Sequence, residues 1–132
     1  MITGEIYFVT ENEVFPEKGW NDFVVVILTW WHDALINLIQ SEQNGTEQAF
    51  EFMDGPLSVK AIKMSENVLE LQFIKERRET EEIFFTVNTR ITEFKKALLK
   101  SVDELLAELR RKNWQTDDVK ELEKRHSFLN TL

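Results

Sequence analysis

Residues 20–39 read WNDFVVVILTWWHDALINLI, an almost wholly apolar stretch that we expect to decide the fold. At 100° per residue on a helix, its polar side chains gather in one seam roughly 80° wide, whereas its apolar side chains cover about half of the circumference. The seam consists of Asp22, Thr29, Asp33, Asn37 and Gln40, and the apolar surface of Phe23, Val24, Ile27, Leu28, Trp30, Trp31, Ala34, Leu35, Leu38 and Ile39. The stretch is therefore predicted to be a helix buried along most of its girth, with both adjacent tryptophans in the core.

The same stretch is long enough to span a membrane, since about 20 residues suffice. However, two aspartates lie inside it, and a carboxylate near the middle of a bilayer costs on the order of 2.5 to 3.5 kcal/mol. Acidic rather than basic residues flank the stretch, and the N-terminus lacks the basic and apolar segments of a signal peptide. The sequence therefore predicts no membrane association and a cytoplasmic protein.

Length and composition narrow the possible functions. The 132 residues suit a single domain, residues 1–132. The chain contains no cysteine, which excludes thiol catalysis and thiolate zinc sites. Its formal net charge of −8 repels nucleic-acid phosphates and anionic lipids. We therefore expect a basic protein partner, and neither nucleic acid nor a membrane.

Turn signals divide the chain into a pattern typical of an antiparallel sheet. Residues 5–10 predict a short strand, followed by a polar loop that passes Pro16 and Gly19. Four extended segments follow the apolar helix, and connections of hairpin length join them. These segments are residues 47–53, 57–64, 68–75 and 80–87, with Asp54-Gly55-Pro56, Ser65-Glu66-Asn67 and Glu76-Arg77-Arg78-Glu79 between them. The strands should form an antiparallel meander.

Alternation with a period of two gives the predicted sheet one strongly apolar face. That face consists of Phe50, Phe52, Leu57, Val59, Ala61, Leu69, Leu71, Phe73, Ile83, Phe85 and Val87. The opposite face mixes charged and bulky side chains, namely Glu70, Gln72, Ile74, Glu82, Phe84 and Thr86. Because an antiparallel sheet can leave one face in water, we expect this second face to be exposed.

The last 43 residues are predicted to form two helices. From residue 90 to residue 113 the apolar period changes to 3.6, with Thr89 as a candidate N-cap. Thr116 can cap a further helix whose inward residues are Val119, Leu122, His126 and Leu129. The predicted fold class is therefore α+β: an antiparallel β-meander of four to five strands with one face packed by three helices, in the order β-α-β-β-β-β-α-α.

The chain shows no pattern typical of catalysis. Its two histidines are His32 and His126. In Trp31-His32-Asp33, adjacent residues on a helix point about 100° apart, so the aspartate cannot orient the imidazole. The four glycines match no phosphate-binding pattern. We expect no catalytic residue, no cofactor and no metal site, although a small enzyme using carboxylates and His32 stays open as an alternative.

Three segments carry a resemblance to a known class of proteins. They are Phe52-Met53-Asp54-Gly55-Pro56, then Leu69-Glu70-Leu71-Gln72-Phe73-Ile74 leading into Lys75-Glu76-Arg77, and then Phe94-Lys95-Lys96-Ala97-Leu98-Leu99-Lys100. Over about residues 52–114 the chain resembles small bacterial immunity proteins of polymorphic-toxin systems. The resemblance implies a cytoplasmic inhibitor that binds a cognate secreted toxin and has no activity of its own. It carries over no inhibitory residues, since such families diverge at the binding surface.

The exposed sheet face is the candidate partner-binding surface. Its residues are Glu70, Gln72, Ile74, Glu82 and Phe84. Ile74 and Phe84 would be apolar anchors at the centre, and the carboxylates would form a charged rim. The alternatives are that the two apolar residues are incidental, or that they form a patch between two copies of the chain. The sequence is compatible with a monomer or a homodimer, including a structural or regulatory oligomer.

Overall fold

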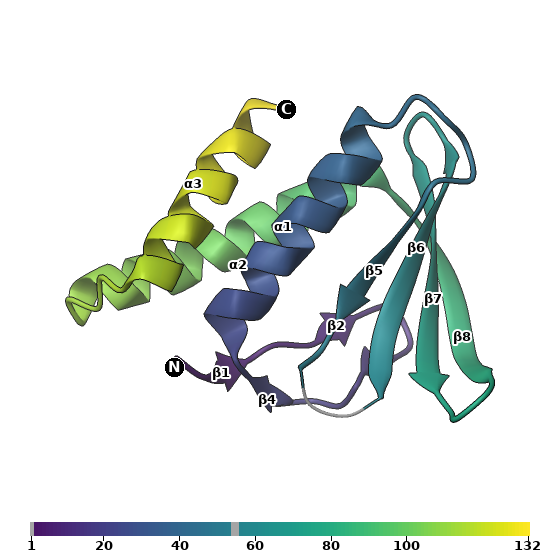
Figure 1. Cartoon of the computed structure of the whole chain (residues 1–132), viewed down its shortest axis with the longest axis horizontal. Coiled ribbons are helices and arrows are strands. Elements are labelled where there is room, and N and C mark those ends of the chain that lie inside the picture. The colour runs from purple at the N-terminus through teal and green to yellow at the C-terminus, as the bar shows by residue number, and fades with distance from the viewer. Residues whose placement is uncertain (1, 54–55) are drawn as a thin grey trace.

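A four-stranded antiparallel sheet forms the centre of the molecule in the computed structural model, which describes residues 2–53 and 56–132. Its strands lie side by side in chain order: β5 (Glu47–Glu51), β6 (Leu57–Ser65), β7 (Val68–Glu76) and β8 (Glu81–Arg90). The helices α1 (Val24–Gln40), α2 (Ile91–Arg111) and α3 (Asp117–Thr131) all lie on one side of this sheet (Figure 1). The predicted α+β class and the predicted order of elements are confirmed.

The three helices do not all touch the sheet. Helix α1 packs against β5, α2 packs against β8, and α3 packs on α1 and α2. Figure 1 shows α3 as an outer layer on the far side of α1 from the strands. None of the described helices is long and apolar enough to cross a membrane. The predicted turn at Asp54-Gly55-Pro56 falls partly on residues 54–55, which lie outside the described residues.

The N-terminal segment differs from the single strand and polar loop that the sequence predicts. It forms four short strands, β1 (Gly4–Glu5), β2 (Phe8–Val9), β3 (Val14–Phe15) and β4 (Asn21–Asp22), in which β1 pairs with β4 and β2 with β3. The segment therefore folds back on itself and does not join the four-stranded sheet. Phe15 is buried, and its ring centroid lies 5.2 Å from that of Phe73, so the predicted loop contributes to the core.

Helix α1 begins at Val24, so Trp20 and Asp22, which the sequence places in the helix, precede it. The buried carboxylate of Asp22 accepts hydrogen bonds from the Trp20 indole (3.1 Å), the Phe23 amide (2.8 Å) and the Met53 amide (3.1 Å). Three donors compensate for the loss of hydration that burial imposes on a carboxylate. Asp22 therefore joins the N-terminal segment, the start of α1 and the chain that follows β5.

The two adjacent tryptophans of α1 have different environments. Trp31 is 5 % exposed, its ring lies 4.8 Å from that of Phe8 and 5.4 Å from that of Phe52, and its indole N–H donates to the Glu51 carbonyl (2.9 Å). Trp30 is 42 % exposed. The prediction that both rings lie in the core is wrong for Trp30, because neighbouring side chains on a helix diverge by about 100°.

A buried lysine stabilises the C-terminal end of α1. Helix α1 has no basic residue in its own last turn. Lys63 of β6 is buried, and its ammonium donates to the carbonyls of Leu38 (2.9 Å) and Ser41 (2.6 Å). A cation at this position complements the negative end of the helix dipole and satisfies carbonyls that the helix leaves without partners.

The start of α2 is capped from the β6–β7 turn and not by the predicted Thr89. Arg90 is the N-cap residue and makes no side-chain cap bond. Instead, the Thr92 amide donates to the Asn67 side chain (3.2 Å) and the Ile91 amide to the Asn67 carbonyl (3.0 Å). For α3, Thr116 occupies the predicted N-cap position but makes no side-chain cap bond, and its hydroxyl donates to the Asp118 carboxylate instead.

A β-bulge in the β7–β8 pair reverses the expected faces of one strand. Phe73 pairs with Phe85 but Ile74 pairs with Ile83, so Phe84 is an extra residue on β8. A one-residue insertion reverses the faces on one side of it, here those of residues 81–83, whereas Phe85 and Val87 after it keep the predicted core face. Ile83, predicted on the apolar face, therefore lies on the outer face and is 49 % exposed, whereas the ring of Phe84 lies 6.1 Å from that of Phe15 on the helix side.

The adjacent tryptophans offer a matched test of this packing. Trp31→Ala removes an enclosed ring and should lower the free energy of unfolding by about 3 to 5 kcal/mol. Trp30→Ala removes the same atoms from a half-exposed site and should cost about 1 kcal/mol or less. Urea unfolding of the two variants measures both values, and equal losses would contradict the placement of the rings.

Candidate functional site

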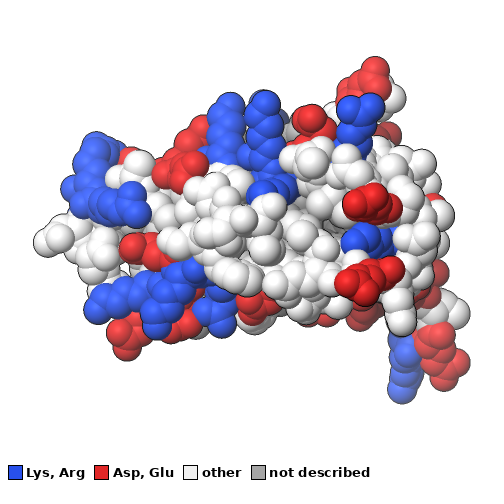
Figure 2. Space-filling view, turned by 90° about the horizontal axis from the view of Figure 1, so that it is seen from above, with Lys and Arg blue, Asp and Glu red and all other residues white. Residues whose placement is uncertain are grey.

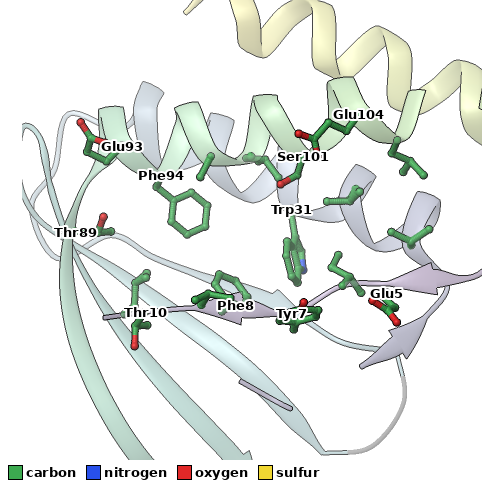
Figure 3. Close-up of a pocket in the computed structure, with 18 of the residues that line it drawn as sticks. Glu5, Tyr7, Phe8, Thr10, Trp31, Thr89, Glu93, Phe94, Ser101 and Glu104 are labelled. Carbon is green, nitrogen blue, oxygen red and sulfur yellow. The ribbon is translucent and has the colours of Figure 1, made fainter. Parts of the chain in front are cut away.

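A groove of about 990 Å³ opens between the N-terminal segment and α2 (Figure 3). One wall is formed by the consecutive residues 4–11, and the other wall by one face of α2. Residues of α1 and β7, among them Trp31 and Phe73, form the floor, and residues 87–89 of β8 also line the groove. In Figure 3 the side chains of Trp31 and Phe94 point from α1 and α2 towards the N-terminal segment.

The face of α2 that lines the groove follows from helical spacing. Its residues recur at intervals of three and four, which places them on one side of the helix. They are Glu93, Phe94, Ala97, Leu98, Ser101, Glu104, Leu105 and Glu108. Ala97 and Ser101, the two shortest side chains in this set, occupy the middle of the face. Bulky side chains at these two positions would fill the space that the groove occupies.

The groove combines an apolar interior with an acidic rim. The rings of Phe8 and Phe94 lie 6.1 Å apart, and both are only partly buried. Five carboxylates line the groove, and none of the described residues that line it is Lys, Arg or His. The five are Glu5, Glu11, Glu93, Glu104 and Glu108. We call this feature the acidic groove.

Most of this negative charge is not neutralised within the described part of the chain. Glu108 is the exception, since it forms ion pairs with Arg111 (2.5 Å) and Lys112 (3.7 Å). The hydrogen bond from Arg111 lowers the pKa of the Glu108 carboxyl below its ordinary value. Among the described residues, no basic side chain lies within 4.0 Å of the other four carboxylates. On the face seen in Figure 2, by contrast, Lys and Arg side chains stand beside Asp and Glu side chains.

The five residues that the sequence suggests for partner binding do not form one surface. Glu70 and Gln72 lie on the outer face of the sheet, where the Gln72 amide donates to Glu70 (2.9 Å). Ile74 is on the same face but is only 1 % exposed, since it lies in an inner strand between Ser58 and Ile83. The expectation that Ile74 is an accessible anchor is therefore wrong.

Glu82 and Phe84 lie on the other side of the sheet because of the β-bulge. Glu82 pairs with Lys75 across the strands, and its carboxylate accepts a hydrogen bond from Arg77 (2.9 Å). Phe84 is 48 % exposed and lies beside Phe15. Residues of the acidic groove were missed by the sequence reasoning. The available signal was the recurrence of Glu93, Glu104 and Glu108 on one face of α2 around short side chains.

The two histidines lie together, in the packing between the three helices. His32 of α1 is fully buried, and its Nδ1 lies 2.6 Å from the Leu28 carbonyl, to which it must donate. Its Nε2 lies 3.4 Å from Nδ1 of His126 on α3. Nε2 of His126 lies 2.6 Å from the carboxylate of Asp103 on α2. One chain of polar contacts therefore links α1, α3 and α2.

The contact between the two rings depends on their charge. Nδ1 of His32 donates to the Leu28 carbonyl, and Nε2 of His126 donates to the Asp103 carboxylate. A proton can therefore lie between Nε2 of His32 and Nδ1 of His126 only when one of the two imidazoles is positively charged. Burial lowers the pKa of His32 below its ordinary value, an effect that the charge of Arg125 reinforces and that of Asp33 opposes.

The histidines line neither of the two described cavities. Both rings are buried where the three helices pack together. A search of the described residues for three or more His, Asp or Glu side chains that could hold a metal ion finds none. The geometry around the histidines supports a structural role.

The lowered pKa of His32 predicts a loss of stability in acid. Below its ordinary pKa of 6.5, the unfolded chain binds a proton at His32 that the folded chain does not. The stability that depends on neutral His32 is thus present above that pH and is lost as the pH falls towards the folded pKa. The free energy of unfolding, measured with urea at pH 7.5 and at pH 5.5, should differ less between the two pH values for His32→Leu than for the natural chain. Equal differences would contradict this assignment.

Comparison with known proteins identifies no relative for this arrangement. A scan against protein-family models, a search of curated proteins and a search of solved structures each give no match.

Proposed function

We propose that this protein is a non-catalytic binding module that captures a basic protein domain, and that the acidic groove is its binding site. The observation that supports the proposal is the combination of a groove of about 990 Å³, a partly exposed apolar interior and a rim with carboxylates but no basic side chain among its described residues. An apolar centre within a charged rim is the usual arrangement of a protein interface.

The charge of the groove suits capture of a basic partner in particular. Unpaired carboxylates such as Glu93 and Glu104 produce a negative potential that raises the association rate of a positive protein. Salt screens this attraction, since the Debye length is about 10 Å at 0.1 M ionic strength. The apolar interior would supply affinity that depends less on salt. Added salt should therefore lower the association rate without abolishing binding.

Within this class, we propose the role of a cytoplasmic immunity-type protein that neutralises a cognate bacterial toxin. This finer proposal rests on the resemblance of residues 52–114 to immunity proteins of polymorphic-toxin systems and on the net charge of −8. Many toxin domains that act on nucleic acid are basic, because they must bind phosphates. An inhibitor with an acidic groove would occupy the same basic surface that the toxin uses for its substrate.

The immunity role predicts that the gene for this protein directly follows a toxin gene. Cells that express the toxin domain encoded there should die, and co-expression of this protein should restore growth. The absence of an upstream toxin gene, or death of the co-expressing cells despite soluble protein, would contradict the immunity role. A toxin domain with an acidic surface would contradict the proposed electrostatic recognition.

A pair of charge reversals tests the groove against the outer face of the sheet. Glu104→Lys changes an exposed carboxylate of the groove, and Glu70→Lys makes the same change of charge on the outer face. Glu104→Lys should weaken binding to the purified toxin domain at least tenfold, mainly through a slower association rate, and Glu70→Lys should change it less than threefold. Surface plasmon resonance at 50 and 300 mM salt measures both. The reverse ranking would place the partner on the sheet face.

A further inference from the structure

One edge of the N-terminal segment has no partner strand. Strand β1 pairs with β4 and β2 pairs with β3, and neither β1 nor β2 has a second partner strand among the described residues. Residues 4–11 therefore form an extended stretch with β3 and β4 on one edge only. The opposite edge, which we call the free edge, presents backbone N–H and C=O groups that can pair with another chain.

The pairing pattern shows which residues direct their backbone groups to the free edge. In an antiparallel pair, hydrogen-bonded and non-hydrogen-bonded residues alternate along each strand. The amides of Ile6 and Thr10 donate to carbonyls of the chain that pairs with this stretch (2.8 Å and 2.9 Å). The alternate residues Glu5, Tyr7 and Val9 therefore direct their backbone groups to the free edge. Within the described part of the chain, the backbone of Tyr7 makes no hydrogen bond.

The acidic groove lies beside the free edge. All eight consecutive residues 4–11 line the groove, although successive residues of an extended chain point to opposite faces. None of residues 12–23, which include the paired strands β3 and β4, lines it. A space that touches every residue of this stretch and none of its partner strands must lie beside the edge that is not paired. A segment in the groove would therefore reach the backbone groups of that edge.

Helix α2 forms the opposite side of this channel. In Figure 3 residues 4–11 run alongside α2 in the opposite direction, so Glu5 and Glu104 lie towards the same end of the groove. Eight residues of extended chain span about 26 Å. The α2 wall, from Glu93 to Glu108, rises about 22 Å at 1.5 Å per residue. The two walls thus have similar lengths and suit a segment of about eight extended residues.

We infer that the acidic groove takes an extended, basic segment of the partner, which pairs with the free edge of residues 4–11 as an added strand. This inference rests on the proposed function and specifies how the partner is held. Directly opposite residues of neighbouring strands share a face. Lys or Arg of the segment would therefore lie opposite the exposed Glu5 and Glu11. Apolar side chains would lie opposite Ile6 and Phe8 and face the floor of the groove.

A strand suits the groove better than a helix does. A helix satisfies its own backbone groups, so it would leave the backbone of Tyr7 without a partner, and it measures about 10 to 12 Å across with its side chains. An added strand needs only about 4.8 Å between neighbouring backbones. It uses the free edge and presents alternate side chains to the site, as in other cases of strand addition. The short side chains of Ala97 and Ser101 leave space for it beside α2.

Residue-resolved amide hydrogen exchange tests this pairing. The probe is a 12-residue peptide of alternating Lys and Val, a length that we choose to exceed the eight residues of the wall. NMR at 50 mM salt should show that the bound peptide slows exchange of the Glu5, Tyr7 and Val9 amides at least tenfold. The amides of Ile6 and Thr10 already donate within the protein, so their exchange should change much less. Equal slowing of all five amides, or none at the first three, would overturn the inference.

Backbone-methylated peptides provide a second measurement. Two further peptides carry N-methyl groups on all Lys or on all Val residues. Each removes the amide donors from one edge of the peptide and leaves its charge unchanged. Because only one edge of an added strand faces residues 4–11, the two methylated peptides should differ in affinity at least tenfold by fluorescence anisotropy. Equal affinities would contradict strand addition.

A charge reversal separates this inference from the proposed function. If Glu104→Lys weakens binding of the parent peptide but both methylated peptides bind as well as the parent does, the groove binds basic segments without strand addition. The inference then fails and the proposed function stands. If the parent peptide does not bind, or if Glu104→Lys leaves its binding unchanged, the groove is not a site for basic segments. Both proposals then fail.

Discussion

The enclosure of Trp31 is the contact on which the rest of the structure depends. Its ring packs against Phe52, which directly follows β5, and against Phe8 of β2, and its indole N–H donates to the carbonyl of Glu51, the last residue of β5. One side chain therefore holds α1 against both the sheet and the N-terminal segment. Because large aromatic rings bury more apolar surface than other side chains, this contact outweighs the weak pairing of the two-residue N-terminal strands.

The acidic groove is a consequence of that contact. The N-terminal segment is held against Trp31 and Phe73, so it lies across the sheet and does not extend it as another strand. Among the described residues β8 therefore pairs only with β7, and α2, which continues directly from β8, forms the wall of the groove opposite residues 4–11. The short side chains Ala97 and Ser101 keep the space between them open. The site thus results from the way three separate segments meet.

Local patterns predicted the elements well where one physical rule acted alone. Alternation placed Phe50, Val59 and Phe73 on the core face, and all three are fully buried. The rule failed in the first part of β8, because the bulge at Phe84 shifts the register by one residue and reverses the faces of residues 81–83. The partner-binding surface predicted from the sequence included residues of that strand, so the members of the predicted surface lie on two different faces of the sheet. Ile74, which was predicted to be exposed, is buried.

The sequence by itself determined the fold class, the order of the main elements, the apolar faces of α1 and α2 and the overall negative charge, since these depend on spacing and composition within short segments. Only the tertiary structure decided which tryptophan is enclosed, where Lys63 binds, and that Glu5, Glu11 and Glu104 surround one groove. These features join residues far apart in the chain. Local sequence periodicity does not predict these features, because they arise only when elements that are distant in the chain pack together.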